Sequence, residues 1–129
     1  MGKSRLLVVE DDVDIGNMLK IYFSGMEYDV DVAVRGSEAL EKTKQVLPHL
    51  IVLDIMLPDI NGKEVCQRVR SDSTLEAVKI ICISGMVEQD KVADLRAAGA
   101  DDFMQKPFDT DRLLERACDM LELERPVLS

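Results

Sequence analysis

The chain has 129 residues, 47% of them hydrophobic and 32% charged, which is the length of one domain with enough apolar material for a core. It contains no apolar run near the roughly 20 residues that span a membrane, no signal-peptide pattern and no closely spaced cysteine pair, so we expect a cytoplasmic protein. The net charge of −9 argues against direct binding of nucleic-acid phosphates by this domain.

Short apolar runs alternate with segments of helical period along the whole chain. Residues 6–9 form an apolar run that predicts a buried strand, and apolar positions between 15 and 23 recur at helical spacing. Valines alternate with other residues over 30–34, which is typical of a half-exposed strand at a sheet edge. A second helix is expected from residue 36 until Pro48 stops it.

The rest of the chain repeats this alternation three times. Residues 50–54 and 78–83 predict two more buried strands, with a short amphipathic helix around 65–69 between them. A weaker helix precedes Gly99, a short strand follows, and a last helix begins at about Asp109 and is ended by Pro126. Five βα units predict a doubly wound parallel sheet, and the polar second strand fits an edge, which favours the order 2-1-3-4-5.

The strand ends should bring polar side chains together. In an open α/β sheet the functional site lies beyond the carboxyl ends of the strands, where the strand order reverses. Five residues follow or end strands there: Glu10, Asp11, Asp54, Ser84 and Lys106. Each acid and Ser84 is by itself commonly a turn or capping residue, and Lys106 by itself is uninformative, so the hypothesis rests on their convergence at one rim of the sheet.

The chemistry of these side chains indicates a metal and a phosphoryl group. Carboxylates from two strand ends repel each other unless a cation or protons intervene, and oxygen ligands in a partly open site suit Mg²⁺. Asp54 can then serve as a carboxylate nucleophile towards phosphorus. Lys106 supplies a compact positive charge and Ser84 a hydroxyl donor for the transferred group. We therefore predict a Mg²⁺-dependent aspartyl-phosphate site with Asp54 as the acceptor.

These residues, in this order and spacing, resemble the receiver domain of two-component response regulators. The similarity covers about residues 5–123 and rests on the first strand and its acids at 6–12, the acceptor strand and loop at 53–62, the hydroxyl position at 83–85, and the fifth strand and lysine motif at 98–108. It implies a flavodoxin-like fold similar to that of chemotaxis regulators. We expect the receiver domain to span residues 1–123 and residues 124–129 to form a tail or the start of a linker.

The resemblance assigns roles to the site residues. Glu10, Asp11 and Asp54 would hold Mg²⁺, with the backbone carbonyl of Met56 as a further ligand. Asp54 would accept the phosphoryl group from a histidine kinase or phosphotransfer protein, and Lys106 would contact that group. The domain would promote its own phosphorylation and dephosphorylation, as a signalling protein and not as an enzyme acting on a separate substrate.

The resemblance also implies a switch. Ser84 would turn towards the phosphoryl group and Phe103 would rotate with it. The coupled movement would remodel the face made by the fourth helix, fifth strand and fifth helix, through which an output domain or partner protein is controlled. A cis peptide bond is expected between Lys106 and Pro107.

Other functions of the same topology fit the residues less well. A flavin-binding domain would need a glycine- and hydroxyl-rich phosphate loop where residues 10–12 are acidic. A phosphatase with two catalytic aspartates would need an acid at position 56, which is Met56. The alternative from another class is a pseudo-receiver, a protein-binding module without phosphorylation, which normally lacks an acid, the acceptor or the lysine.

The sequence leaves two alternatives for the target that the switch controls. The domain either acts alone by binding a partner protein or is the receiver of a DNA-binding transcription regulator. Asp101, Asp102 and Arg116 would allow salt bridges across a phosphorylation-driven homodimer, although exposed ion pairs contribute little. His49, the only histidine, precedes the third strand at the end opposite the acidic rim, which argues against a phosphotransfer role.

Overall fold

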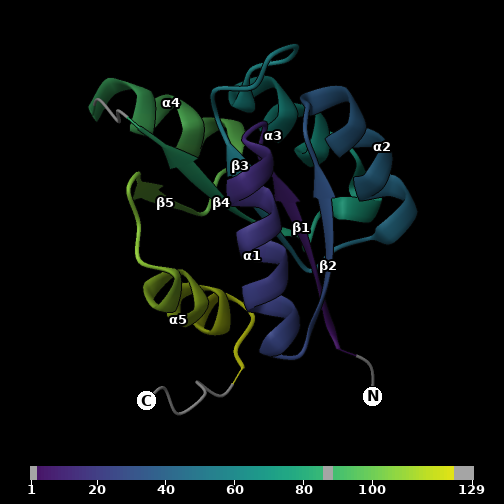
Figure 1. Ribbon diagram of the computed structural model, residues 1–129. Coiled ribbons are helices and arrows are strands. Elements are labelled where there is room, and N and C mark those ends of the chain that lie inside the picture. The colour runs from purple at the N-terminus through teal and green to yellow at the C-terminus, as the bar shows by residue number, and fades with distance from the viewer. Residues whose placement is uncertain (1–2, 86–88, 124–129) are drawn as a thin grey trace.

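The computed structural model describes residues 3–85 and 89–123, which form a parallel sheet with helices on both faces (Figure 1). The five strands lie in the order β2-β1-β3-β4-β5 and all neighbours are parallel, so the predicted doubly wound topology is confirmed. The strands are β1 Ser4–Val9, β2 Tyr28–Ala33, β3 Leu50–Asp54, β4 Lys79–Ser84 and β5 Asp102–Gln105. The tail or linker predicted at 124–129 lies outside the described residues.

Helices connect successive strands and cover both faces of the sheet. The α-helices are α1 Val13–Gly25, α2 Gly36–Val46, α3 Gly62–Arg70, α4 Gln89–Ala98 and α5 Thr110–Met120, and a short 3₁₀ turn, η1, spans Ser73–Leu75. Helices α1 and α5 pack on one face, and α2, α3 and α4 pack on the other (Figure 1). No helix among the described residues has the length and apolar character needed to cross a membrane.

Alternate residues of the strands build two cores, one on each face of the sheet. In β1, Leu7 and Val9 join the core under α2, α3 and α4, whereas Leu6 and Val8 join the core under α1 and α5. Neighbouring residues of a strand point to opposite faces, so a continuous apolar run is the pattern of a strand buried on both sides. All of β3 is buried as well, so Asp54 stands at the end of a fully enclosed strand.

Helix α2 takes its N-terminal cap from a distant loop. Its own N-cap residue, Arg35, makes no capping hydrogen bond. Instead the carboxylate of Asp59, in the loop after β3, accepts hydrogen bonds from the backbone N–H groups of Gly36 at 2.7 Å and Ser37 at 3.0 Å. These bonds hold the pKa of Asp59 well below its ordinary value because they favour the charged form. The loop that follows Asp54 is thereby tied to α2.

Helix α5 ends earlier than the sequence indicates. We expected Pro126 to end it, and this was wrong, because the helix stops at Met120. Glu122 adopts a left-handed φ of 56°, and the N–H of Leu123 donates to the carbonyl of Cys118 at 2.8 Å. These are the features of a Schellman-type end, which closes a helix through backbone hydrogen bonds and needs no proline.

Two glycine substitutions separate steric crowding from helix propensity. A Cβ added at Gly62 would lie 2.6 Å from the Cα of Ile55, whereas one added at Gly25 would have no atom within 4 Å. We expect Gly62→Ala to lower the free energy of unfolding by about 1–3 kcal/mol, because backbone must shift. Gly25→Ala, the control, should leave it unchanged or raise it by up to about 1 kcal/mol. Urea unfolding followed by circular dichroism measures both, and equal effects would contradict the close contact at Gly62.

Candidate functional site

The carboxyl ends of the strands form the rim predicted from the sequence. Glu10 directly follows β1, Asp54 ends β3, and Lys106 directly follows β5. The carboxylate oxygens of Glu10, Asp11 and Asp54 lie within 4.8 Å of one another. The side chains of Glu10 and Asp54 are buried, and that of Asp11 is exposed to solvent. The structure therefore brings the predicted acids into one cluster that is open on the Asp11 side.

Lys106 joins the two buried acids of this cluster. Its Nζ lies 2.9 Å from Oε2 of Glu10 and 2.9 Å from Oδ2 of Asp54. The lysine reaches this position because its backbone N–H donates to the carbonyl of Ser84 at 2.7 Å, which continues the pairing of β4 with β5. The peptide bond between Lys106 and Pro107 is cis, as predicted.

Backbone N–H groups orient the second oxygen of each buried carboxylate. Oδ1 of Asp54 accepts a hydrogen bond from the N–H of Met56 at 2.9 Å, and Oε1 of Glu10 accepts one from the N–H of Asp12 at 3.2 Å. Asp12 in turn caps α1 through its own side chain. The loop after β3 closes on itself, because the N–H of Gly62 donates to the carbonyl of Ile55 at 3.1 Å. Both acids are therefore held in place by their own loops.

The electrostatics of the cluster reflect two buried acids that share one lysine. Burial raises the pKa of Glu10 from its ordinary 4.5 to about 7; the hydrogen bond from Lys106 opposes this rise, and the nearby Asp54 adds to it. Burial lowers the pKa of Lys106, but its hydrogen bonds with Asp54 and Glu10 outweigh that effect and raise it overall. A divalent cation bound between the carboxylates would oppose the rise in the pKa of Glu10, because it favours the charged form.

The donor set fits Mg²⁺. Three carboxylates supply oxygen ligands within a space that one small ion can bridge, and one of them faces solvent. Magnesium is normally bound by a few carboxylates and keeps several waters, so a partly open, all-oxygen site meets its requirements. No histidine or cysteine belongs to this cluster, which disfavours softer metals.

The two predicted switch residues lie on one face of the sheet. Ser84 ends β4 and is buried, and alternation along that strand puts it on the same face as Cys82. Phe103, in β5, is half-buried and packs against that same core. The guanidinium carbon of Arg96, on α4, lies 4.8 Å from the centre of the Phe103 ring, within the range of a cation–π contact. Phe103 therefore links the sheet to α4.

Three further residues refine the sequence predictions. Met56 was singled out for its carbonyl, but its side chain is 71% exposed beside Asp54. The capping role of Asp59 was missed; the absence of a capping residue at the start of α2 was the available signal. His49 lies at the opposite end of the sheet, where its Nδ1 accepts a hydrogen bond from the N–H of Arg5 at 2.9 Å. It is remote from the acid cluster, as predicted.

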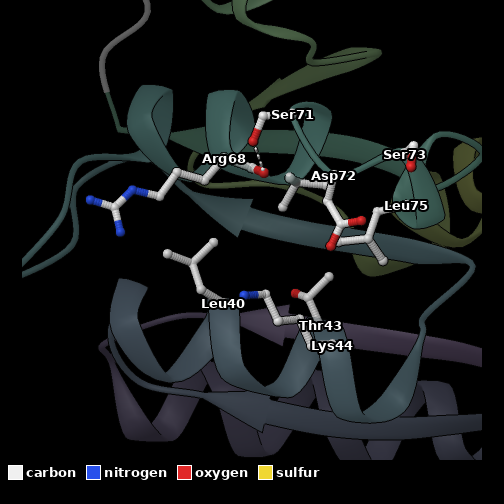
Figure 2. Close-up of a pocket in the computed structure, with 9 residues that line it drawn as sticks. Leu40, Thr43, Lys44, Arg68, Ser71, Asp72, Ser73 and Leu75 are labelled. Carbon is white, nitrogen blue, oxygen red and sulfur yellow. Dashed lines mark hydrogen bonds between the residues drawn. The ribbon is translucent and has the colours of Figure 1, made fainter.

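A separate hollow of about 550 Å³ lies between α2 and the segment from α3 to η1 (Figure 2). Leu40 and Leu75 contribute apolar surface to it, and Lys44, Arg68 and Asp72 contribute charges. It contains none of the predicted site residues, so it is distinct from the acidic rim.

Comparison with known proteins decides the family. The family model of the response regulator receiver domain matches residues 6–118. The chain belongs to this family. Response regulators of two-component systems are signalling proteins, and the five-stranded parallel sheet described above is the fold of this receiver domain.

Individual relatives agree with this assignment. Response regulator ArlR of Staphylococcus saprophyticus is 39% identical over 118 residues, which cover 92% of this chain and 52% of that protein. The phosphate regulon transcriptional regulatory protein PhoB of Rhizobium meliloti is 34% identical over 122 residues, which cover 95% of this chain and 54% of that protein. A CheY-like receiver domain protein from Methanospirillum hungatei superposes with a TM-score of 0.89 at 28% identity, and the match covers 94% of this chain and 95% of that one. The receiver therefore spans about half the length of the curated relatives it matches.

The raised pKa of Glu10 predicts a pH dependence of stability. In the unfolded chain Glu10 ionises near pH 4.5, and in the folded domain only near 7, so the folded state binds more protons between these values. Without divalent metal, the free energy of unfolding of the wild type should fall, relative to that of Glu10→Gln, as the pH rises from about 4.5 to 7, and then level off. Urea unfolding in EDTA across this range tests it; parallel curves for the two proteins would contradict the shift.

Proposed function

We propose that this receiver is a Mg²⁺-dependent phosphorylation switch with Asp54 as the phosphoacceptor. The observation that carries the proposal is the shared lysine: Lys106 lies 2.9 Å from both Glu10 and Asp54, with Asp11 completing the acid cluster. A buried aspartate, a positioned cation and a set of hard oxygen ligands are the parts that phosphoryl transfer to a carboxylate needs.

Transfer to Asp54 requires positioning and charge neutralisation more than covalent chemistry. A carboxylate oxygen of Asp54 attacks the phosphorus of a phosphohistidine on a histidine kinase or phosphotransfer protein. The O–P bond forms as the N–P bond breaks, and the electron pair stays on the imidazole nitrogen. Lys106 exchanges a carboxylate contact for a phosphoryl oxygen, and the hydroxyl of Ser84 donates to another. Hydrolysis by water at the same phosphorus resets the domain.

Glu10, Asp11 and Asp54 are the proposed metal ligands, together with the backbone carbonyl of Met56. When bound, Mg²⁺ would neutralise the repulsion between the carboxylates and the incoming phosphoryl oxygens. The N–H of Met56 already donates to Asp54 at 2.9 Å, so this residue is held next to the acceptor. Support for the set comes from the 4.8 Å clustering of the three acids.

The proposed output face consists of α4, β5 and α5. Ser84 and Phe103 would move together towards the phosphorylated site, and Phe103 would carry the change to α4 through its contact with Arg96. The ion pairs considered for a homodimer are formed within one chain: Arg116 lies 2.7 Å from Asp102, and Asp101 pairs with an arginine of α3. A phosphorylation-driven dimer would have to exchange these pairs or use other contacts.

A DNA-binding output domain is the proposed target of the switch. Among the relatives, PhoB of Rhizobium meliloti is described as a transcriptional regulatory protein and MtrA of Mycolicibacterium smegmatis as a DNA-binding response regulator. The receiver spans residues 1–123 in this proposal, and the output domain would follow it. With a net charge of −9, the receiver itself is poorly suited to contact DNA, so it would control the output domain through protein–protein contacts.

Intact mass spectrometry after incubation with acetyl phosphate tests the acceptor. We expect a Mg²⁺-dependent gain of about 80 Da in the wild type and none in Asp54→Asn, because the amide is not a nucleophile towards phosphorus. Asp59→Asn is the matched control, since Asp59 lies in the same loop but caps α2. It should keep the adduct. Absence of an adduct under every condition would favour a pseudo-receiver that only binds proteins.

Removal of one exposed ligand tests the metal site. At a Mg²⁺ concentration of about 100 times its dissociation constant, the folded wild type should gain about 2.7 kcal/mol of stability over the metal-free state. Asp11→Asn should lose most of this gain while unfolding normally in EDTA, because Asp11 is exposed and outside the core. Asp14→Asn, an exposed acid of α1 outside the cluster, is the control. Equal Mg²⁺ responses of both variants would argue against Asp11 as a ligand.

A further inference from the structure

Arg70, the last residue of α3, connects four elements at the end of the sheet opposite the acid cluster. Its Nε donates to the carbonyl of Gly99, just after α4, at 3.0 Å. One terminal nitrogen donates to the carbonyl of Val78, just before β4, at 2.6 Å, and the other to Oδ2 of Asp101, just before β5, at 2.8 Å. The arginine side chain is 23% exposed, so these bonds are partly shielded from water. A planar guanidinium with donors in a fixed geometry is suited to hold such divergent acceptors.

Asp101 extends this connection into the sheet. The same Oδ2 that accepts from Arg70 also accepts from the N–H of Ile80 at 2.8 Å, and the N–H of Asp101 donates to the carbonyl of Ile80 at 2.8 Å. The start of β5 is therefore bound to β4 by backbone and side chain together. Hydrogen bonds to charged groups contribute more than neutral ones, particularly where water is partly excluded.

The turn between α4 and β5 is shaped around the arginine. Gly99 has a φ of +119°, which disfavours any side chain, and a Cβ there would lie 2.3 Å from Cγ of Arg70. The N–H groups of Gly99 and Ala100 both donate to the carbonyl of Leu95, at 3.1 and 3.0 Å, and so close α4. The residues 99–101 are thus held by α4, by β4 and by Arg70.

Helix α4 is anchored unevenly along its length. Among its residues from 91 onwards, the buried ones are Leu95 and Ala98, both in the second half, and Val92 is half-buried. Residues 91–94 therefore have fewer buried apolar side chains to hold them than residues 95–98, which is the property of a segment that moves at low energetic cost. The second half is the part that leads directly into the turn held by Arg70.

We propose that Arg70 is a positioning residue that fixes residues 99–101 as the pivot of the switch, so that phosphorylation displaces residues 91–94 of α4 and the side chain of Phe103 while the turn stays in place. The inference rests on the proposed phosphorylation of Asp54. A fixed pivot confines the response to the output face, because the end of α4 that joins the turn is held in place while Arg96, which contacts Phe103, and the residues before it respond. Without Arg70, the structural change caused by phosphorylation would spread into the turn at residues 99–101.

Arg68, which lies two residues before Arg70 in α3, offers a matched control. Its only ion pair among the described residues is with Glu64 at 3.5 Å, and its side chain is 57% exposed. Its guanidinium extends away from Ser71 and Asp72 (Figure 2). Removing Arg68 changes the charge of α3 as removing Arg70 does, but it leaves the turn after α4 untouched.

The test compares the wild-type chain with the variants Arg70→Ala, Arg70→Lys and Arg68→Ala by nuclear magnetic resonance. Without any phosphoryl mimic, we expect the amides of residues 99–101 to exchange with solvent about tenfold faster or more in Arg70→Ala, and at nearly wild-type rates in Arg68→Ala. Arg70→Lys, which keeps the charge but not the fork of donors, should fold normally and lie between them.

Beryllium fluoride with Mg²⁺, used as a mimic of the phosphoryl group, provides the second readout. In the wild type and in Arg68→Ala we expect chemical-shift changes at residues 91–94 and at Phe103 that are several times larger than those at residues 99–101. In both Arg70 variants the changes should extend into residues 99–101. Acetyl phosphate should still add about 80 Da to every variant, since Arg70 is remote from the site.

Two results would overturn the proposal. One is a wild-type response at residues 99–101 as large as that at 91–94, and the other is an unchanged response pattern in both Arg70 variants. Lower stability of Arg70→Ala alone does not support it, because a merely structural arginine would have the same effect. If the wild type gives neither an adduct nor a response to beryllium fluoride, the phosphorylation proposal fails, and the proposal that the turn is a pivot fails with it. The amide exchange rates would still decide whether Arg70 holds the turn.

Discussion

The sharing of one lysine by two buried acids is the interaction on which the rest of the site depends. Two carboxylates at the ends of adjacent, enclosed strands repel each other, and Lys106 compensates only part of that repulsion. Burial raises the pKa of Glu10 to about 7, although the hydrogen bond from Lys106 opposes the rise, and the nearby Asp54 adds to it. A site with this charge distribution favours a cation that replaces the proton and an anion that binds the lysine, and the proposed phosphorylation would require both.

The sheet makes this arrangement possible and also separates its consequences. Parallel strands put all their carboxyl ends at one rim, so acids and a lysine from distant segments meet without any long-range loop. At the opposite ends of the strands, Arg70 joins α3, β4, β5 and the end of α4. One end of the domain thus holds the acid cluster and Lys106, and the other end holds the turn that Arg70 connects to its neighbours.

Much of the fold and of the site was predictable, because its signals are local. The apolar runs at 6–9 and 50–53 are buried on both faces, as such runs require, and the half-exposed second strand is at the edge. Glu10, Asp11, Asp54 and Lys106 converge because strand ends and topology alone determine their position. The end of α5 was predicted wrongly, since proline is a visible signal and a backbone-bonded Schellman end at Glu122 is not.

The sequence by itself therefore determined the order of the elements, the edge strand, the membership of the acidic rim and the chemistry of its side chains. These follow from the pattern of hydrophobicity and from residue type at strand ends. Only the tertiary structure decided that Asp59 caps α2, that Arg96 covers Phe103 and that Arg70 holds the turn after α4. Each of these contacts joins residues whose partners are chosen by packing in three dimensions, and neither propensity nor periodicity carries information about such a choice.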